Sequence, residues 1–462
     1  LGLEAASPWV RYRPMANAFD PQHALAHVRV LASSEMEGRR SGTPGLDRAA
    51  DYIAGQLRAM GLQPAGEAHG GAYTCLQTSL RDLCDLAGLP QLSLKTPGGQ
   101  ELAPLAYAQD FREYYDYVPR AGSARGEVVL VGASELVTQA QSRRLAGRIA
   151  LLDGEPPFLE RPGAAALLII APAERLARHD LPPDVMRTPQ QQEVPYLYIS
   201  EQVAERILAV GGHSLAELRR QHGSTGPGQG LWIQTGVIAE VSVRLAVRRD
   251  VPIRNGLAML PGRDARLARE AIFVVAHYDG LGRWPDGTIL PGANDNAAGV
   301  AVMLETARLL GESEFQPKRT VFFVAWAPGE RWSALDPQAM LAARPGFLEY
   351  RVTAVIEVRG VGAGSGQGLA LSPASSYRAV QVLRQAARRQ GVPTNTQGQV
   401  LHSTRVQTWY TRLPYAALSW QDSDQHEHQV TDTADSVNPQ KLGRAGRVLA
   451  LALMYMAGEA RY

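Results

Sequence analysis

The stretch Ala271–Asp279 reads AIFVVAHYD, a run of six apolar residues that ends in a histidine and, two residues later, an aspartate. A short apolar run without alternation predicts a strand that is buried on both faces of a parallel sheet. The glycine-rich loop Gly292–Gly299, GANDNAAG, comes next and leads into a helical pattern over Asp295–Leu310. A strand, a loop and a helix in this order predict one unit of a doubly wound α/β fold.

The same alternation of strands and helices continues to the end of the chain. We expect strands at Thr320–Trp326, Val352–Val358 and Tyr415–Trp420, and helices at Tyr377–Gln390 and Pro439–Met456. Nearer the amino terminus, helices are predicted over Asp20–Leu31 and from Pro44 to Gly61, the second with Thr43 as its N-cap. Sheets of this kind bind ligands at the carboxyl ends of their strands, so functional side chains are expected directly after each strand.

The middle of the chain has a different pattern, with short β-runs separated by glycine and proline. The clearest runs are Val128–Val131, Arg148–Leu152, Ala165–Ile170 and Pro195–Ile199, and the polar stretch Leu181–Glu193 predicts a surface loop. We therefore expect three parts. Residues 1–105 form the amino-terminal helical part of the main domain, 106–235 an inserted β-rich domain, and 236–462 the main α/β domain.

The composition is that of a globular protein, with 45% apolar and 20% charged residues and a net charge of +2. No arginine–aromatic stripe predicts a nucleic-acid partner, and no apolar run is long enough to span a membrane. Cys75 and Cys84 are either two buried thiols or one disulfide of an exported protein. Because the chain starts at Leu1 without a methionine, we expect a protein exported to the periplasm, the envelope or the medium.

Polar side chains follow the predicted strands at the points where these end. His277 and Asp279 follow the first strand, Asp295 lies in the glycine-rich loop, and Glu330 and His428 follow later strands. Histidine, aspartate and glutamate are ligands that zinc prefers, so this edge of the sheet is a predicted zinc site. Asp279 is expected to orient the His277 ring without binding the metal itself. Asp432 is expected to cap the turn that holds His428.

These motifs resemble the co-catalytic zinc aminopeptidase family, whose relatives include glutaminyl cyclase, glutamate carboxypeptidase and transferrin receptor. The segment Glu37–Arg39 resembles the amino-terminal part of that family, and residues 126–210 resemble its protease-associated domain. The resemblance implies a doubly wound, mostly parallel sheet with helices on both faces, plus a β-rich protease-associated insert. It also implies release of amino-terminal residues from peptides, with His277 as the first zinc ligand, Asp295 as the bridging ligand and His428 as the last.

The sequence departs from the family at its pair of glutamates, one a general base and the next a zinc ligand. An alignment without gaps from Arg319 places Gly329 at the base position and Glu330 at the ligand position. A slip of one residue would instead make Glu330 the base and place Arg331 at the ligand position. We favour the gapless alignment because the strand register up to Trp326 then needs no adjustment. In both alignments one carboxylate is missing.

A second departure lies in the family's Asn-x-Asp motif, where Glu357 takes the asparagine position and Arg359 that of the aspartate ligand. Arginine has no lone pair to offer a metal. At about 4 Å and an effective dielectric constant near 20, a guanidinium and a zinc ion repel by roughly 8 kcal/mol. We therefore expect one zinc at most, held by Asp295, Glu330 and His428, or none. Arg359 is expected to pair with Asp295 or Glu330 in place of the missing metal, and Glu357 is the candidate to replace the lost ligand or base.

The expected function is that of a zinc metallopeptidase-like protein with reduced or lost aminopeptidase activity, since general-base catalysis is worth roughly 10²–10⁴-fold. The alternative is a catalytically inactive scaffold that binds a peptide or a protein partner. A third hypothesis is a one-zinc glutaminyl cyclase. The expected partners are thus a peptide substrate or a peptide or protein ligand, and the oligomeric state stays open.

Overall fold

The computed structural model describes residues 7–69, 72–115, 120–132, 136, 143–155, 163–182, 194–222, 231–330, 340, 347, 349–373, 377–395 and 414–462. The chain divides into two compact units, one of Leu1–Arg81 with Asp250–Tyr462 and one of Asp82–Arg249. The second unit begins earlier and ends later than the predicted insert 106–235. The reason is that β5 (Gln91–Lys95) pairs with β11 (Trp232–Val243) and so belongs to the sheet of that unit.

The first unit is built on a nine-stranded sheet in the order β1-β12-β16-β13-β17-β20-β18-β19, with β4 also paired to β12. Its strands are β1 Gln63–Pro64, β4 Leu76–Leu86, β12 Leu245–Leu260, β13 Glu270–His277, β16 Thr320–Trp326, β17 Arg351–Val358, β18 Leu369–Pro373, β19 Thr394–Asn395 and β20 Tyr415–Trp420. The four central strands β16, β13, β17 and β20 are parallel neighbours. Two short hairpins, β2 Ala68–His69 with β3 Ala72–Tyr73 and β14 Gly282–Arg283 with β15 Ile289–Leu290, complete the strands described for this unit. The predicted α/β fold is confirmed.

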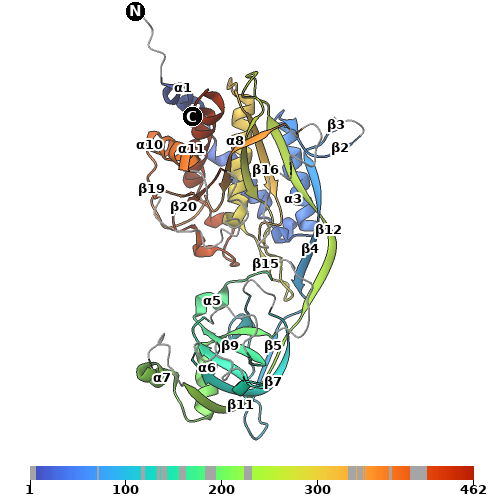
Figure 1. Ribbon diagram of the computed structural model, residues 1–462, viewed down its shortest axis with the longest axis vertical. Helices are drawn as coiled ribbons and strands as arrows, with labels where there is room; N and C mark the ends of the chain where they lie inside the picture. The colour runs from blue at the N-terminus through green and yellow to red at the C-terminus, as the bar shows by residue number, and fades with distance from the viewer. Residues whose placement is uncertain are drawn as a thin grey trace, which may run out of the picture. The chain divides into compact units, whose positions relative to one another are not determined.

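Helix α8 (Ala298–Glu312) packs on the central strands β13, β16 and β17 and contacts α2 and α11 (Figure 1). The other helices of this unit are α1 Pro8–Asn17, α2 Pro21–Leu31, α3 Pro44–Ala59, α10 Tyr377–Arg389 and α11 Pro439–Gly458, with single turns at η1 Ser34–Arg39, η5 Ser423–His426 and η6 Ala434–Ser436. Their apolar sides are buried, as the 3.6-residue pattern predicts.

One of the predicted helices begins later than expected. The helix predicted over Asp295–Leu310 begins only at Ala298, because Asp295 and Asn296 have non-helical backbone angles within the irregular turn η3 (Ala293–Ala297). This difference matters for function, because it leaves the Asp295 carboxylate outside the helix. Thr43 is the N-cap residue of α3 as predicted, but its hydroxyl donates a hydrogen bond to the carbonyl oxygen of Arg40, at 2.7 Å, and accepts none from the helix.

One face of the sheet carries an apolar cluster that fixes the central strands. Phe273 of β13 and Phe322 of β16 stack with their ring centroids 4.8 Å apart, and Phe347 packs over them. Burial of such rings stabilises a core by roughly 1.5–3 kcal/mol per side chain. The strand ends that carry the polar residues are therefore held in a rigid frame.

The second unit contains a seven-stranded sheet in the order β5-β11-β7-β8-β9-β10-β6. Its remaining strands are β6 Phe111–Glu113, β7 Gly122–Val131, β8 Ile149–Asp153, β9 Ala166–Ala171 and β10 Tyr196–Ser200, and its helices are α5 Ala173–Ala177, α6 Glu201–Val210 and α7 Leu215–His222. An apolar cluster covers each face of this sheet. Residues 183–193 of the predicted surface loop lie outside the described residues, and the protease-associated identity of this unit stays a prediction.

Cys75 and Cys84 are both buried and do not form a disulfide with each other, so the alternative with two thiols holds. No helix within the described ranges is long and apolar enough to cross a membrane. The expected export of the protein stays a prediction, which cell fractionation would test.

Candidate metal centre

The polar residues predicted at the strand ends come together at one edge of the main sheet. His277 ends β13, Glu330 follows β16, and His428 follows β20. These strands are parallel and lie close together in the sheet, so their carboxyl ends meet. All three side chains are buried, with exposed fractions of 5% or less.

Asp295 reaches this edge from the irregular turn η3. The turn is held by Asp432, whose carboxylate accepts the backbone N–H groups of Asn294 at 2.7 Å and of Asp295 at 3.0 Å. The expectation that Asp432 caps the turn of His428 is thus wrong, because its side chain caps the turn of Asp295. Burial raises the pKa of Asp432 to about 7. The amide of Asn296 adds a second anchor by donating to the carbonyl oxygens of His277 and Val358, at 3.2 and 3.0 Å.

Arg39 is a further positioning residue, and sequence reasoning gave it no role of its own. Its guanidinium is fully buried and donates to the carbonyl oxygens of Tyr278, Pro291 and Gly292, each at 2.8 Å. It therefore ties the loop after β13 to the loop that leads to Asp295. The one signal in the sequence was its place in the segment Glu37–Arg39, which resembles the zinc aminopeptidase family.

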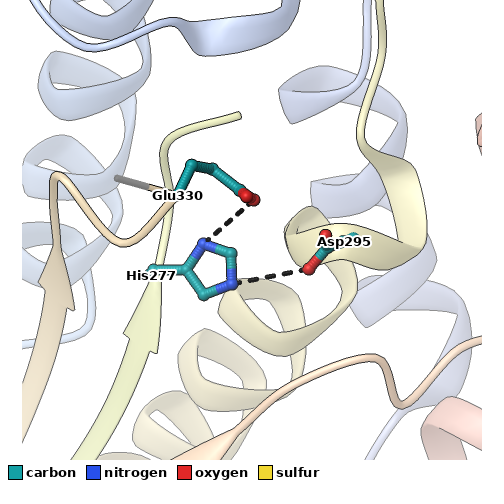
Figure 2. A group of neighbouring side chains, drawn as sticks. All are labelled: His277, Asp295 and Glu330. Carbon is teal, nitrogen blue, oxygen red and sulfur yellow. Dashed lines mark ion pairs between the residues drawn. The ribbon is translucent and has the colours of Figure 1, made fainter. Parts of the chain in front are cut away.

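The imidazole of His277 lies between two carboxylates (Figure 2). Its Nε2 atom is 3.5 Å from Oδ1 of Asp295, and its Nδ1 atom is 3.6 Å from Oε1 of Glu330. Burial lowers the pKa of His277, but the carboxylates of Asp279, Asp295 and Glu330 outweigh it and raise the pKa to about 10. The carboxylates around His277 therefore favour the protonated form of its ring.

Asp279 organises the loop that carries Glu330. Its carboxylate accepts the backbone N–H groups of Gly329 at 2.7 Å and of Glu330 at 3.1 Å, and the hydroxyl of Ser41 at 3.1 Å. It lies 3.7 Å from Nδ1 of His277, which is too long for an ordinary hydrogen bond. The predicted part of Asp279 in orienting the His277 ring is therefore secondary to its part in fixing the loop.

Gly329, at the position predicted for the general base, packs directly against His277. A Cβ atom at residue 329 would lie 2.3 Å from Cβ of His277 and 2.6 Å from its Cγ, much closer than real Cβ atoms approach. This arrangement leaves no room for any side chain at residue 329. Arg331, the other substituted position, lies outside the described residues.

His428 contacts two of the predicted ligands through one atom. Its Nε2 atom is 3.2 Å from Oε2 of Glu330 and 3.5 Å from Oδ2 of Asp295. Ligand atoms bound to one tetrahedral zinc at about 2.0–2.1 Å lie about 3.3 Å from each other. The two separations of His428 are close to this value.

Arg359 lies on the other side of Asp295. Its Nη2 atom is 3.2 Å from Oδ1 of Asp295 and 2.9 Å from Oε1 of Glu427. Burial lowers the pKa of Arg359, but the two carboxylates outweigh burial, so that the net pKa is raised. The guanidinium in turn helps to hold the pKa of Asp295 below its usual range, although burial alone would raise it. The predicted pairing with Asp295 is present. Glu427 was missed, although it directly precedes His428 in the sequence.

Glu357, the candidate substitute for the lost ligand or base, is engaged elsewhere. It accepts a short hydrogen bond from the hydroxyl of Tyr415 on the neighbouring strand β20. Burial raises the pKa of Glu357. It belongs to neither of the two groups of metal-ligand type that the described residues form.

Those two groups are His277–Asp295–Glu330 and Asp295–Glu427–His428, and within each the candidate ligand atoms lie within 4.8 Å of one another. Both ring nitrogens of His277 are buried and form no hydrogen bond of ordinary geometry with any described residue. The candidate ligand atoms of both groups are buried histidine nitrogens and carboxylate oxygens, which are ligand types that zinc prefers. The guanidinium of Arg359 places a positive charge on one side of the cluster.

Comparisons with known proteins agree with this fold. Residues 255–453 match the model of Peptidase family M28, and the predicted relation to the zinc aminopeptidases is thereby confirmed: the main unit has the fold of this peptidase family. The uncharacterized protein YfbL of Escherichia coli strain K12 is 34% identical over 131 residues, which is 27% of this chain. The match spans 40% of the length of YfbL.

Two solved structures share the fold over almost the whole chain. The aminopeptidase from Aneurinibacillus sp. strain AM-1 has a TM-score of 0.67 and 19% identity, covering 96% of this chain and 95% of that one. BSAP, a zinc aminopeptidase from Bacillus subtilis, has a TM-score of 0.59 and 18% identity, covering 95% of both chains.

Proposed function

We propose that this protein is a zinc-peptidase-like protein in which Arg359 takes the place of one of two metal ions, with aminopeptidase activity reduced or lost. The observation that carries the proposal is the position of the Arg359 guanidinium, 3.2 Å from Asp295 and 2.9 Å from Glu427. A buried carboxylate cluster needs a positive partner, which is either a metal or a basic side chain. Arg359 supplies one permanent positive charge here.

Asp295, Glu330 and His428 would hold the remaining metal, one zinc. His428 supports this assignment, because its Nε2 atom lies at tetrahedral ligand separations from both carboxylates. When bound, the zinc would polarise the scissile carbonyl and lower the pKa of a water molecule. The chain's own residues would orient the ligands, through the contacts of Asp432 with the turn of Asp295 and of Asp279 with the loop of Glu330.

The reduction in activity follows from Gly329. A general base contributes roughly 10²–10⁴-fold to such reactions, and glycine provides none. The buried carboxyl group of Glu357 is a poor replacement, because it accepts a hydrogen bond from Tyr415 and belongs to neither of the two groups of metal-ligand type among the described residues. Turnover would then rest on the zinc and its ligands alone.

The test is hydrolysis of a panel of aminoacyl-anilides by the purified, zinc-supplemented protein, beside a zinc aminopeptidase that keeps its base. We expect a kcat/KM at least roughly 10²-fold below that of the reference enzyme. Asp295→Ala should abolish the remainder, whereas exposed Asp435→Ala should change nothing. A rate equal to that of the reference enzyme would refute reduced activity.

The second candidate is a non-catalytic scaffold that binds a peptide or protein partner. The packing of His277 against Gly329 favours it, because no catalytic side chain can occupy that position in this arrangement. Calorimetric titration with short peptides distinguishes the two candidates. Binding without turnover, lost in Asp295→Ala, supports the scaffold, and turnover that depends on Asp295 excludes it.

A further inference from the structure

A polar cavity lies at the end of the main sheet opposite to the metal centre, where the parallel strands begin. Its volume is about 450 Å³, and its walls include Glu270 at the start of β13, Arg351 at the start of β17, and Arg461 near the carboxyl-terminal end. Strand β13 runs from Glu270 to His277, and seven residue steps of about 3.3 Å separate the two ends by roughly 23 Å. The cavity is therefore distinct from the metal centre.

The side chains that line this cavity have an excess of positive charge. Four arginines, Arg319, Arg351, Arg378 and Arg461, surround one carboxylate, that of Glu270. Glu270 is already paired with Arg319 and with Arg351, each at 2.6 Å. Among the described residues, Arg378 and Arg461 form no ion pair. The guanidiniums of Arg378 and Arg461 line the cavity, where an anion from solution can contact them.

Two of these arginines, Arg319 and Arg378, are held in place before any anion arrives. Arg319 is almost fully buried and donates to the carbonyl oxygens of Met456 and Ala460, at 3.0 and 3.1 Å. The ring of Tyr462 lies 4.8 Å from Cζ of Arg319 and 5.0 Å from Cζ of Arg378. Cation–π contacts of this kind restrict the guanidinium that they hold. A preorganised site loses less side-chain entropy when it binds its ligand.

Helix α10 adds to the positive field. It is thirteen residues long, has no acidic residue in its first turn, and begins beside the cavity, where Arg378 and Ala379 form part of the wall. The amino-terminal end of a helix carries a partial positive charge and favours anions. The helix end and the arginines therefore act on the same space.

We propose that this cavity binds a small anion that carries a diphosphate group. Guanidinium groups bind phosphate oxygens through paired hydrogen bonds, and several of them converge here. The volume lies within the range of small-ligand sites, about 300–1,000 Å³. Two linked phosphoryl groups match the charge excess better than a single carboxylate would. The diphosphate is either inorganic or part of a nucleotide.

Calorimetric titration with inorganic diphosphate and, separately, with ADP tests this proposal. The double variant Arg378→Ala/Arg461→Ala should weaken diphosphate binding by about tenfold or more, since it removes two charge-assisted contacts. Arg388→Ala, an exposed residue of the same helix outside the cavity, should bind as the unchanged protein does. Both variants leave the metal centre unchanged, so a difference in diphosphate affinity between them is due to the arginines of the cavity.

The two probes identify the source of the ligand. Equal affinity for both indicates inorganic diphosphate, and tighter binding of ADP indicates a nucleotide. No binding of either probe at millimolar concentration overturns the proposal, as does equal binding by the double variant and by Arg388→Ala. The single variant Arg461→Ala, at an exposed terminal position, repeats the test if the double variant unfolds.

Discussion

The metal centre has two sides that share Asp295 and differ in what faces it. On one side, His428 and Glu330 offer a nitrogen and an oxygen at separations typical of zinc ligands. On the other side, Arg359 joins Asp295 to Glu427. On the first side His428 and Glu330 share a hydrogen bond of 3.2 Å and are of the ligand types that zinc prefers, whereas the second side contains a cation, Arg359. We propose that this sheet edge keeps half of a metal site and replaces the other half with a side chain.

This difference explains why identity of fold does not establish activity. The fold of a peptidase family depends on the apolar strands and helices, which are intact here. The chemistry depends on a few side chains at the strand ends, and we propose that Arg359 and Gly329 change it here.

Asp295→Ala removes the residue that both sides share, and we expect the largest effect from it. Arg359, and His277 with its raised pKa, would lose a buried counter-charge, so the free energy of unfolding should fall by roughly 3–5 kcal/mol. Denaturant unfolding of the metal-free protein measures this loss. Exposed Asp435→Ala is the matched control, and equal stability of the two variants would mean that Asp295 is not the electrostatic centre of the cluster.

Gly329→Ala tests whether the packing of His277 against residue 329 excludes a side chain at the position predicted for the general base. The added Cβ atom would lie 2.3 Å from Cβ of His277, so the free energy of unfolding should fall by about 3 kcal/mol through overpacking. Gly55→Ala, in helix α3 with nothing within 4 Å of its added Cβ, should instead stabilise by roughly 0.5–1 kcal/mol. A tolerated Gly329→Ala would show that the loop moves aside readily and that a base could fit there.

His27 is a buried histidine outside the site and provides the reference for His277. The ring of His27 contacts the hydroxyl of Tyr52. Burial, and to a smaller extent the nearby His23, lowers the pKa of His27 to about 4. The carboxylates around His277 have the opposite effect and raise the pKa of His277. The folded protein favours the neutral ring of His27, whereas the unfolded chain takes up a proton below about pH 6.5. The contribution of His27 to the free energy of unfolding is therefore complete above pH 6.5 and is lost as the pH falls towards 4. Between pH 7 and pH 5 the loss should be about 2 kcal/mol.

Denaturant unfolding of the unchanged protein and of His27→Gln across this range measures that loss. The stability advantage of the unchanged protein should shrink as the pH falls. An advantage that stays constant would contradict the lowered pKa of His27.

Much of this architecture could be predicted from the sequence. The apolar runs located β13, β16, β17 and β20, and the polar residues after them were expected at one sheet edge, where the structure places them. The start of α8 could not be predicted, because the sequence pattern around Asp295 is the same whether the helix begins at Asp295 or at Ala298. The difference depends on Asp432, a residue distant in sequence that holds the turn of Asp295. Glu427 and Arg39 were missed because their roles depend on contacts between distant segments.

The content of bound zinc tests the central claim most directly. Elemental analysis after zinc loading and removal of excess metal should give one zinc per chain or less in the unchanged protein. Arg359→Asp, which restores a carboxylate and removes the opposing charge, should bind one zinc more than the unchanged protein does. Two tightly bound zinc ions per chain in the unchanged protein would contradict the replacement of a metal by Arg359.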